Sequence, residues 1–291
     1  MDQQKYYEGF FKLLKQNDPT TAQKLHPIFG STTDINCMFK LSCEKGHIES
    51  AKWLYQLGAN IHANNEYAFR LSCANGHIVV AKWLCQLGVN INVNNDEAFR
   101  WSCENGQFEV AKWLYQLGAD IHAWNDNSFT LTCSNGHIEV AKWLYQLGAN
   151  IHAKDDLPFR LVCESGHIEV AKWLYQLGAD IHAANEHAFR LSSSNGHIEI
   201  AQWLYQLDAD IHANHNEAFK NGTTEIVSWL KELNSIKASE IDNSKKESEI
   251  DNLKKESEID NLKKESEIYN LKKEILDLKY QLNQIKSIIE S

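Results

Sequence analysis

The sequence predicts an all-α protein, a solenoid of stacked helix hairpins followed by a long charged helix. Three observations predict it. First, tryptophans recur every 30 residues through the middle of the 291-residue chain, at Trp53, Trp83, Trp113, Trp143, Trp173 and Trp203. Second, each 30-residue unit has apolar residues at helical spacing on both sides of a glycine-containing turn. Third, from about Lys237 the composition changes to Glu, Lys, Ser and Ile at helical spacing.

Composition and charge exclude several classes of function. The net charge is −10, from 29 basic and 39 acidic residues, and phosphate contacts need a basic face, so we expect no nucleic-acid partner. No apolar run approaches the roughly 18 residues that span a bilayer. The first residues show no cationic segment followed by an apolar one, which argues against a secretory signal. Seven cysteines fit poorly with a fully paired disulfide framework. We expect a soluble, cytoplasmic protein without a membrane partner.

One unit, from Asp96 to Gly118, illustrates the predicted hairpin. Asp96 is a suitable N-cap for a short first helix, and Asn105-Gly106 ends that helix because glycine tolerates the left-handed conformation. A second helix follows, with Phe108, Trp113 and Leu117 at helical spacing. A hairpin this small cannot bury its apolar face alone, so each is expected to be covered by the next. Six full units run from Phe39 to Ala218, and a truncated seventh follows.

The segment GHIEVAKWLYQLGADIHA, from Gly166 to Ala183, resembles the turn, second helix and closing loop of the ankyrin repeat. The resemblance implies an ankyrin-type α-solenoid over residues 37–235. The unit has 30 residues where ankyrin repeats have about 33. The family's Thr-Pro-Leu-His opening is replaced by Glu97-Ala98-Phe99-Arg100 and its counterparts, and its β-hairpin finger should be short or absent. Tryptophan-bearing 30-residue repeats are similar to the ankyrin families of giant DNA viruses of amoebae, which would place the protein in host cytoplasm.

Histidine, cysteine and arginine also recur at the repeat period, and we interpret these ladders as structural. Equivalent histidines in adjacent repeats lie too far apart to share a metal ion, because stacked helices are about 8–10 Å apart. We expect the histidines to bond loop backbone and the cysteines to be buried thiols. The arginine row should either pair with nearby acids such as Glu66 and Asp96 or form a solvated face of mixed charge. We therefore predict no metal, no cofactor and no catalytic residues, and so no enzyme.

Variation among the copies suggests where a partner would bind. The second helix hardly changes, whereas the link after it and the entrance to the next first helix vary most. The resemblance places the partner-binding surface of such proteins at this edge and on the inner face of the first helices. The predicted contact residues for an unidentified protein partner are Tyr67, Glu97, Trp101, Trp124, Asn127, Lys154, Leu157 and His187. The alternative is that these loops vary without function.

The two ends differ from the repeats. Residues 1–36 are expected to form an N-terminal helical cap. Residues 236–291 are expected to form a charged helix, with a coiled coil strongest over 268–289. Isoleucine at position a and leucine at position d favour a parallel dimer. The predicted homodimer contacts are Ile268, Leu271, Ile275, Leu278, Leu282, Ile285 and Ile289. A lone helix, or one folded back on the repeats, is the alternative.

The predicted function is a non-catalytic protein–protein interaction scaffold. Two alternatives stay open at this point. The protein could be an adaptor that delivers clients to a ubiquitin ligase or another enzyme. It could also be a structural assembly protein that oligomerises through its C-terminal coiled coil.

Overall fold

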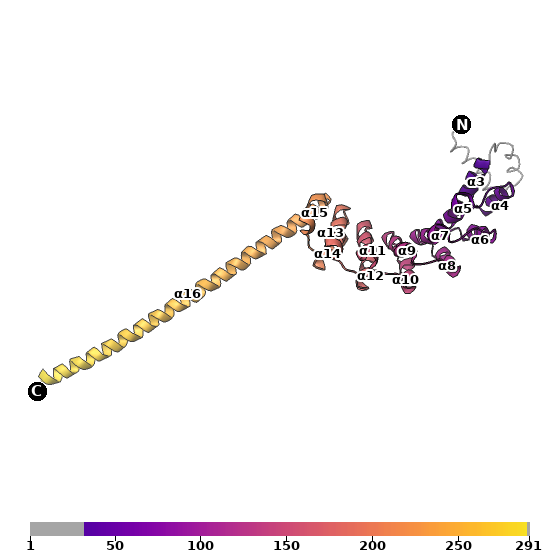
Figure 1. The fold of residues 1–291 in the computed structure, drawn as a ribbon. Helices are drawn as coiled ribbons and strands as arrows, with labels where there is room; N and C mark the ends of the chain where they lie inside the picture. Colours follow the sequence, from indigo (N-terminus) through magenta and orange to yellow (C-terminus); the bar gives the residue numbers. More distant parts are fainter. Residues whose placement is uncertain (1–31, 290–291) are drawn as a thin grey trace. The chain divides into compact units, whose positions relative to one another are not determined.

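The computed structural model describes residues 32–289, and its side chains over 35–280 and at Leu282. Within these ranges every regular element is an α-helix, and Figure 1 shows a row of first helices beside a row of second helices. The first helices are α3 (Thr32–Glu44), α5 (Ala63–Ala74), α7 (Val93–Glu104), α9 (Ala123–Ser134), α11 (Ala153–Ser165), α13 (Ala183–Ser194) and α15 (Ala213–Asn221). The second helices are α4 (Ile48–Gln56), α6 (Ile78–Gln86), α8 (Phe108–Gln116), α10 (Ile138–Gln146), α12 (Ile168–Gln176), α14 (Ile198–Gln206) and the start of α16 (Thr224–Ile289).

The chain divides into two compact units, residues 1–227 and 228–291. Helix α16 runs without interruption through residues 235 and 236, where the sequence suggested a domain boundary. The expected N-terminal cap lies mostly outside the described residues, which begin at Thr32. Residues 32–36 belong to α3, the first helix of the first repeat.

The core of the first unit repeats with the sequence. Successive first helices contact one another, and each first helix from α3 to α13 contacts the second helix of its own repeat. The most deeply buried rings come from the same position of successive first helices, namely Phe39, Phe69, Phe99, Phe129, Phe159 and Phe189. Burying one such ring contributes about 1.5–3 kcal/mol. The all-α hairpin solenoid is therefore confirmed.

The tryptophan ladder joins neighbouring repeats through ring contacts. Trp143 in α10 packs against three rings of the preceding repeat, with centroid distances of 6.3 Å to Phe99, 5.5 Å to Phe108 and 5.7 Å to Tyr115. The tilted and edge-on geometry is the arrangement that aromatic quadrupoles favour. The tryptophans of this ladder are only half-buried, however. Trp143 keeps partial solvent access because the second helices form an outer layer that no further element covers among the described residues.

At four repeats, a glycine in the turn between the two helices contacts a histidine of the following repeat. Gly106 has φ +70°, and a Cβ built there would lie 2.6 Å from Nδ1 of His137 in the following repeat. In the equivalent place, Nε2 of His77 donates to the carbonyl of Glu44 at 2.9 Å. Glycine is therefore required both for its backbone conformation and for the space that the ring occupies. The expected bond from this histidine row to backbone of the neighbouring repeat is thus found at His77 and His197.

The described part of the second unit is one long helix. Ion pairs one turn apart follow its surface, from Lys246 to Asp242, Lys254 to Asp251 and Lys263 to Asp260. Isolated helices gain a few tenths of a kcal/mol from each such pair. Five of the expected coiled-coil residues are exposed, namely Ile268, Leu271, Ile275, Leu278 and Leu282. The side chains of Ile285 and Ile289 lie outside the described residues.

Candidate partner-binding surface

The link between repeats forms a short left-handed turn where ankyrin repeats usually carry a finger. Three successive residues have positive φ, as at Asn64 (52°), Asn65 (55°) and Glu66 (60°). The middle residue of each such turn is Asn, Asp or His, the types that tolerate this region best. The expectation that Asp96 is an N-cap is wrong, because the N-cap of α7 is Asn92 and Asp96 is a buried residue at the end of such a turn. No β-strand occurs among residues 32–289, which agrees with the predicted loss of the finger.

Arginines of the first helices hold these turns in place. Arg70 Nη2 donates to the carbonyl of Asn64 at 2.8 Å, and its Nε donates to that of Asn65 at 2.9 Å. Arg100, Arg160 and Arg190 make the same two bonds in their own repeats. Charge-assisted bonds to carbonyls that point together offset part of the cost of left-handed backbone.

The arginines also reach the next repeat, and there the expected partners are wrong. Arg70 pairs with Glu97 and Arg190 with Glu217, each 27 residues later, rather than with the acids at the turns. Arg160 lies 3.4 Å from Nδ1 of His187 at the same position. Ion pairing is thus found for Arg70 and Arg190, where it joins neighbouring first helices, whereas Arg100 lies against the Trp124 ring.

The acids at the turns bind the second histidine row instead. Nδ1 lies 2.8 Å from the carboxylate oxygen in the pairs His62–Glu66, His122–Asp126 and His152–Asp156. The expectation that this row bonds loop backbone is therefore wrong. Glu66 also accepts the backbone N–H of Asn90 in the next repeat at 3.3 Å. Glu66, Asp126, Asp156 and Glu186 thus each bond a histidine of their own repeat, and Glu66 bonds the following loop as well.

Neighbouring groups and burial shift the pKa values of several side chains in and near these turns. The hydrogen bond to Glu186 raises the pKa of His182 above its ordinary value. Asp96 has Asn92 in place of a histidine, its Oδ1 has no hydrogen-bond partner, and burial raises its pKa. Burial, followed by the charges of Arg160 and Arg190, lowers the pKa of His187. Burial also raises the pKa of the thiols of Cys73, Cys103, Cys133 and Cys163.

One face of the first helices stays half-exposed, and we call it the first-helix face. Its apolar row comes from equivalent positions on successive helices, which are Leu41, Leu71, Trp101, Leu131, Leu161 and Leu191. The opposite side of the same helices is fully buried at Phe99 and Cys103 and their counterparts. The face is therefore held by the core while presenting apolar side chains to solvent.

Cations and aromatic rings alternate along the N-terminal half of this face. The Arg70 guanidinium lies 5.0 Å from the ring centroid of Tyr67 and 5.2 Å from that of Trp101, and these two rings meet edge-on at 6.3 Å. Arg100 lies 4.4 Å from the ring of Trp124. Cation–π contacts of this kind fix the orientation of rings that remain open to solvent.

The structure places the predicted contact residues in two adjoining sets. Tyr67, Glu97, Asn127, Leu157 and His187 are half-buried and follow the left-handed turns directly. Trp124 and Lys154 lie within the turns, and the Trp124 side chain is 58% exposed. Trp101 lies one helical turn further along α7 and belongs to the apolar row. Sequence reasoning missed the five leucines of that row, because they do not vary and variation was the signal that singled out the other candidates.

Within residues 32–289, histidines and acids are distributed as pairs, and no three His, Cys, Asp or Glu side chains gather as metal ligands would. No helix in that range is both long and apolar enough to cross a membrane. The surface offers hydrogen-bonding groups, cations and apolar rings along a row of helices.

Comparison with known proteins decides the family. The sequence profile described as "Ankyrin repeats (3 copies)" matches residues 39–125 and 129–215, which together are more than half of the chain. The chain belongs to the ankyrin-repeat family. Ankyrin repeats are in general modules of protein–protein interaction. Among solved structures, the ankyrin repeat domain of human ASB11 is similar, with 18% identity and a TM-score of 0.49 over 62% of this chain and 95% of that one. A comparison with curated proteins gave no match.

Proposed function

We propose that this ankyrin-repeat protein is a non-catalytic scaffold that binds a partner protein through its first-helix face. The observation that carries the proposal is the row of half-exposed apolar side chains on six successive first helices. A continuous apolar stripe on a rigid support is typical of interaction surfaces. The polar rim comes from the left-handed turns, whose side chains extend beside the stripe.

Trp101 and Trp124 are the proposed anchors of the interface. Arg70 lies over the ring of Trp101, and Arg100 lies over the ring of Trp124. Neither ring is buried in the core. Tryptophans fixed in this way lose little conformational freedom on binding, which is one reason that they dominate interface energetics. The further contacts that we propose are Tyr67, Glu97, Asn127, Lys154, Leu157 and His187.

Replacing Trp101 with the residue found at its position in the other repeats tests the proposal. Leucine occupies the position of Trp101 in the other five full repeats, so Trp101→Leu should keep the fold. We expect it to weaken the complex with the natural partner by tenfold or more, on the order of a hot-spot residue. The matched control is Val79→Glu on α6, where other repeats carry glutamate and the side chain is exposed. Equal affinities for the two variants would contradict the proposal.

Assembly through the C-terminal helix is a second candidate function, favoured by the exposed apolar residues of α16. Five residues with a-and-d spacing are each at least half exposed, from Ile268 to Leu282. A second copy of the same helix would cover them as a parallel coiled coil. Dimerisation would make the scaffold bivalent and raise its avidity without new contacts.

The adaptor role has a separate test. Recovery of ubiquitin-ligase subunits in a pull-down with the full chain would indicate that role.

The free thiols support a location in a reducing compartment, and we place the protein in the cytoplasm. All seven cysteines are unpaired, and five of them are buried in the first helices. Persistent free thiols are typical of reducing compartments. If the resemblance to giant-virus ankyrin proteins reflects its origin, that compartment is the host cytoplasm.

A further inference from the structure

Two junctions between repeats hold a glutamate in the same way. Glu97 accepts from the guanidinium of Arg70 in the preceding repeat, and from Nδ2 of Asn94 in its own turn at 2.9 Å. Glu217 accepts from Arg190 and from Nδ2 of Asn214 in the same arrangement. A cation and an asparagine, contributed by two successive repeats, thus form a cradle for one carboxylate.

Where the glutamate is absent, the asparagine is absent too, with one exception. The junction after Arg100 has Trp124 and Asn127 at these positions, and the junction after Arg160 has Ala184 and His187. In the junction between α9 and α11, Thr130 replaces the arginine, Lys154 replaces the asparagine and Leu157 replaces the glutamate. These junctions have no cradle, because the amide donor is missing.

The exception is the first junction, between α3 and α5. Lys40 stands in the place of Arg70, and Asn64 in the place of Asn94, but Tyr67 replaces the glutamate. Lys40 makes no ion pair with any of the described residues, and its ammonium lies 5.8 Å from the centroid of the Tyr67 ring. Both donors of the cradle are therefore present without the carboxylate that they hold elsewhere in the chain.

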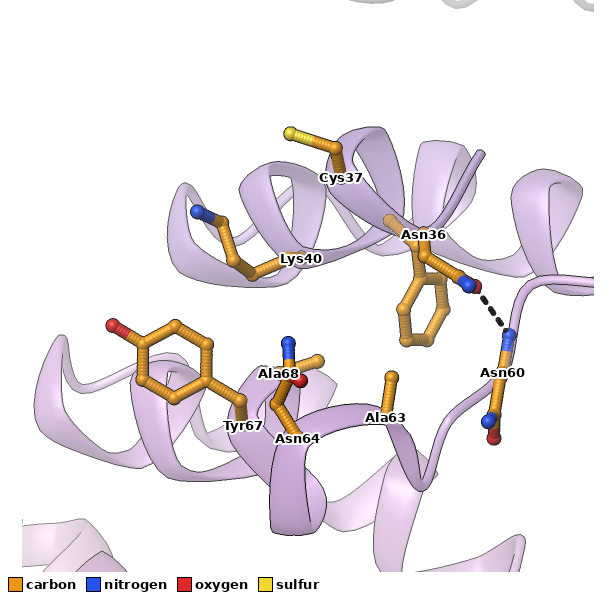
Figure 2. A pocket seen from close by; sticks show the side chains of 9 residues that line it. Asn36, Cys37, Lys40, Asn60, Ala63, Asn64, Tyr67 and Ala68 are labelled. Atoms are coloured by element: carbon orange, nitrogen blue, oxygen red, sulfur yellow. Dashed lines mark hydrogen bonds between the residues drawn. The ribbon is translucent and has the colours of Figure 1, made fainter. Parts of the chain in front are cut away.

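A cavity of about 340 Å³ lies at this junction. Its lining includes Lys40, Asn64 and Tyr67, together with the apolar side chains of Phe39, Ala63 and Ala68. Figure 2 shows the Lys40 ammonium and the Tyr67 ring on the same side of the opening, with Asn64 beside the ring. The volume is at the lower end of the range for small-ligand sites, which is about 300–1,000 Å³.

We propose that this cavity binds an aspartate or glutamate side chain of the partner protein. Lys40 and Asn64 donate to its carboxylate, and the apolar lining contacts its methylene groups. One cation and one amide match a singly charged carboxylate, as they do at Glu97. The proposal rests on the proposed function, since the cavity lies at the N-terminal end of the first-helix face, and it specifies the chemistry of the partner there.

The test uses the full chain and capped tetrapeptides of the form Gly-Leu-X-Gly, with glutamate, glutamine or phosphoserine at X. Binding is followed by the NMR shifts of the Asn64 side-chain amide and the Tyr67 backbone amide. We expect the glutamate peptide to bind about tenfold more tightly than the glutamine peptide, because a charge-assisted hydrogen bond is lost in the latter. Tighter binding of the phosphoserine peptide would overturn the choice of carboxylate.

Substitutions of the cavity residues test whether the peptide binds at this place. Lys40→Gln and Asn64→Ala should each remove the preference for glutamate, and alanine is tolerated at this position because Ala184 occupies it in another repeat. Tyr67→Glu should fill the cradle from within and abolish the peptide response. Lys45→Gln, on an exposed lysine just beyond α3, is the control.

The outcomes separate this inference from the function on which it rests. Equal responses to glutamate and glutamine peptides, unaffected by Lys40→Gln, would overturn the carboxylate site. If Trp101→Leu still weakened the natural complex, the scaffold function would stand without this site. If Trp101→Leu had no effect, the scaffold function itself would fail.

Discussion

At the scale of the residue, the two kinds of perturbed histidine give opposite pH dependences. The folded pKa of His182 is raised, chiefly by its hydrogen bond to Glu186. Its stabilising contribution is therefore complete below the unfolded pKa of about 6.5 and is lost as the pH rises through the folded pKa. We expect His182→Gln to cost more stability at pH 5.5 than at pH 8.5, measured by urea unfolding.

His187 should show the reverse trend. Burial is the main cause of its lowered folded pKa, so the protein loses stability as the pH falls from the unfolded value towards the folded one. His187→Gln removes that loss and should therefore stabilise the protein relative to wild type at low pH. Parallel pH profiles for the two variants would contradict the assigned contacts.

Two glycines distinguish backbone strain from packing. Gly118 has φ +98° with open space around it, whereas Gly106 has φ +70° with the His137 ring in the way. Gly118→Ala should cost about 1 kcal/mol from its left-handed backbone alone. Gly106→Ala should cost about 1–3 kcal/mol more, because the added Cβ displaces the ring. Chemical denaturation measures both costs. Equal costs would rule out this contact between repeats.

At the scale of the element, the ring contacts of α10 predict the effect of removing one tryptophan. Trp143→Ala deletes contacts with Phe99, Phe108 and Tyr115. We expect a loss of about 3 kcal/mol, the lower end of the range for buried aromatic residues, since the ring is only partly buried. Trp124→Ala, at an exposed ring, should change stability by less than about 0.5 kcal/mol. Similar losses for the two variants in thermal unfolding would be inconsistent with the ladder.

The helices themselves could be predicted from sequence, and the turns between them could not. Apolar spacing around Asn105-Gly106 indicates two helices because it reflects local burial. The turn at Asn64, Asn65 and Glu66 needs three successive left-handed residues, and propensity accounts for single residues of this kind only. Side-chain contacts stabilise it, namely the guanidinium of Arg70, five and six residues further on, on its carbonyls, and the N–H of Asn90 in the next repeat on its acid.

The candidate partner-binding residues could likewise be predicted only where the sequence pattern marks them. The two off-register tryptophans, Trp101 and Trp124, could be identified because they break a repeated pattern. The half-exposed leucines could not, because their constancy resembles that of core residues. The pairing of Arg70 with Glu97 could not be predicted either, because it depends on which helix faces which across a repeat.

At the scale of the whole molecule, α16 predicts the state of association. We expect the full-length protein to sediment as a dimer of the 33.4 kDa chain and a shortened chain ending at Asn234 to sediment as a monomer. Leu271→Asp combined with Leu278→Asp should also give a monomer, because charges at position d disfavour the seam. Monomers in every case would exclude assembly through the helix and leave the repeats as a monovalent scaffold.

Coverage of the first-helix face by a partner protein can be measured by hydrogen–deuterium exchange of the full chain, alone and in its natural complex. We expect the partner to slow exchange in α3, α5, α7, α9, α11 and α13 and in the left-handed turns between them, because these elements carry the apolar row and its polar rim. Exchange in α6, α8, α10 and α12 should be unchanged. Slower exchange confined to the second helices or to α16 would show that the partner binds elsewhere.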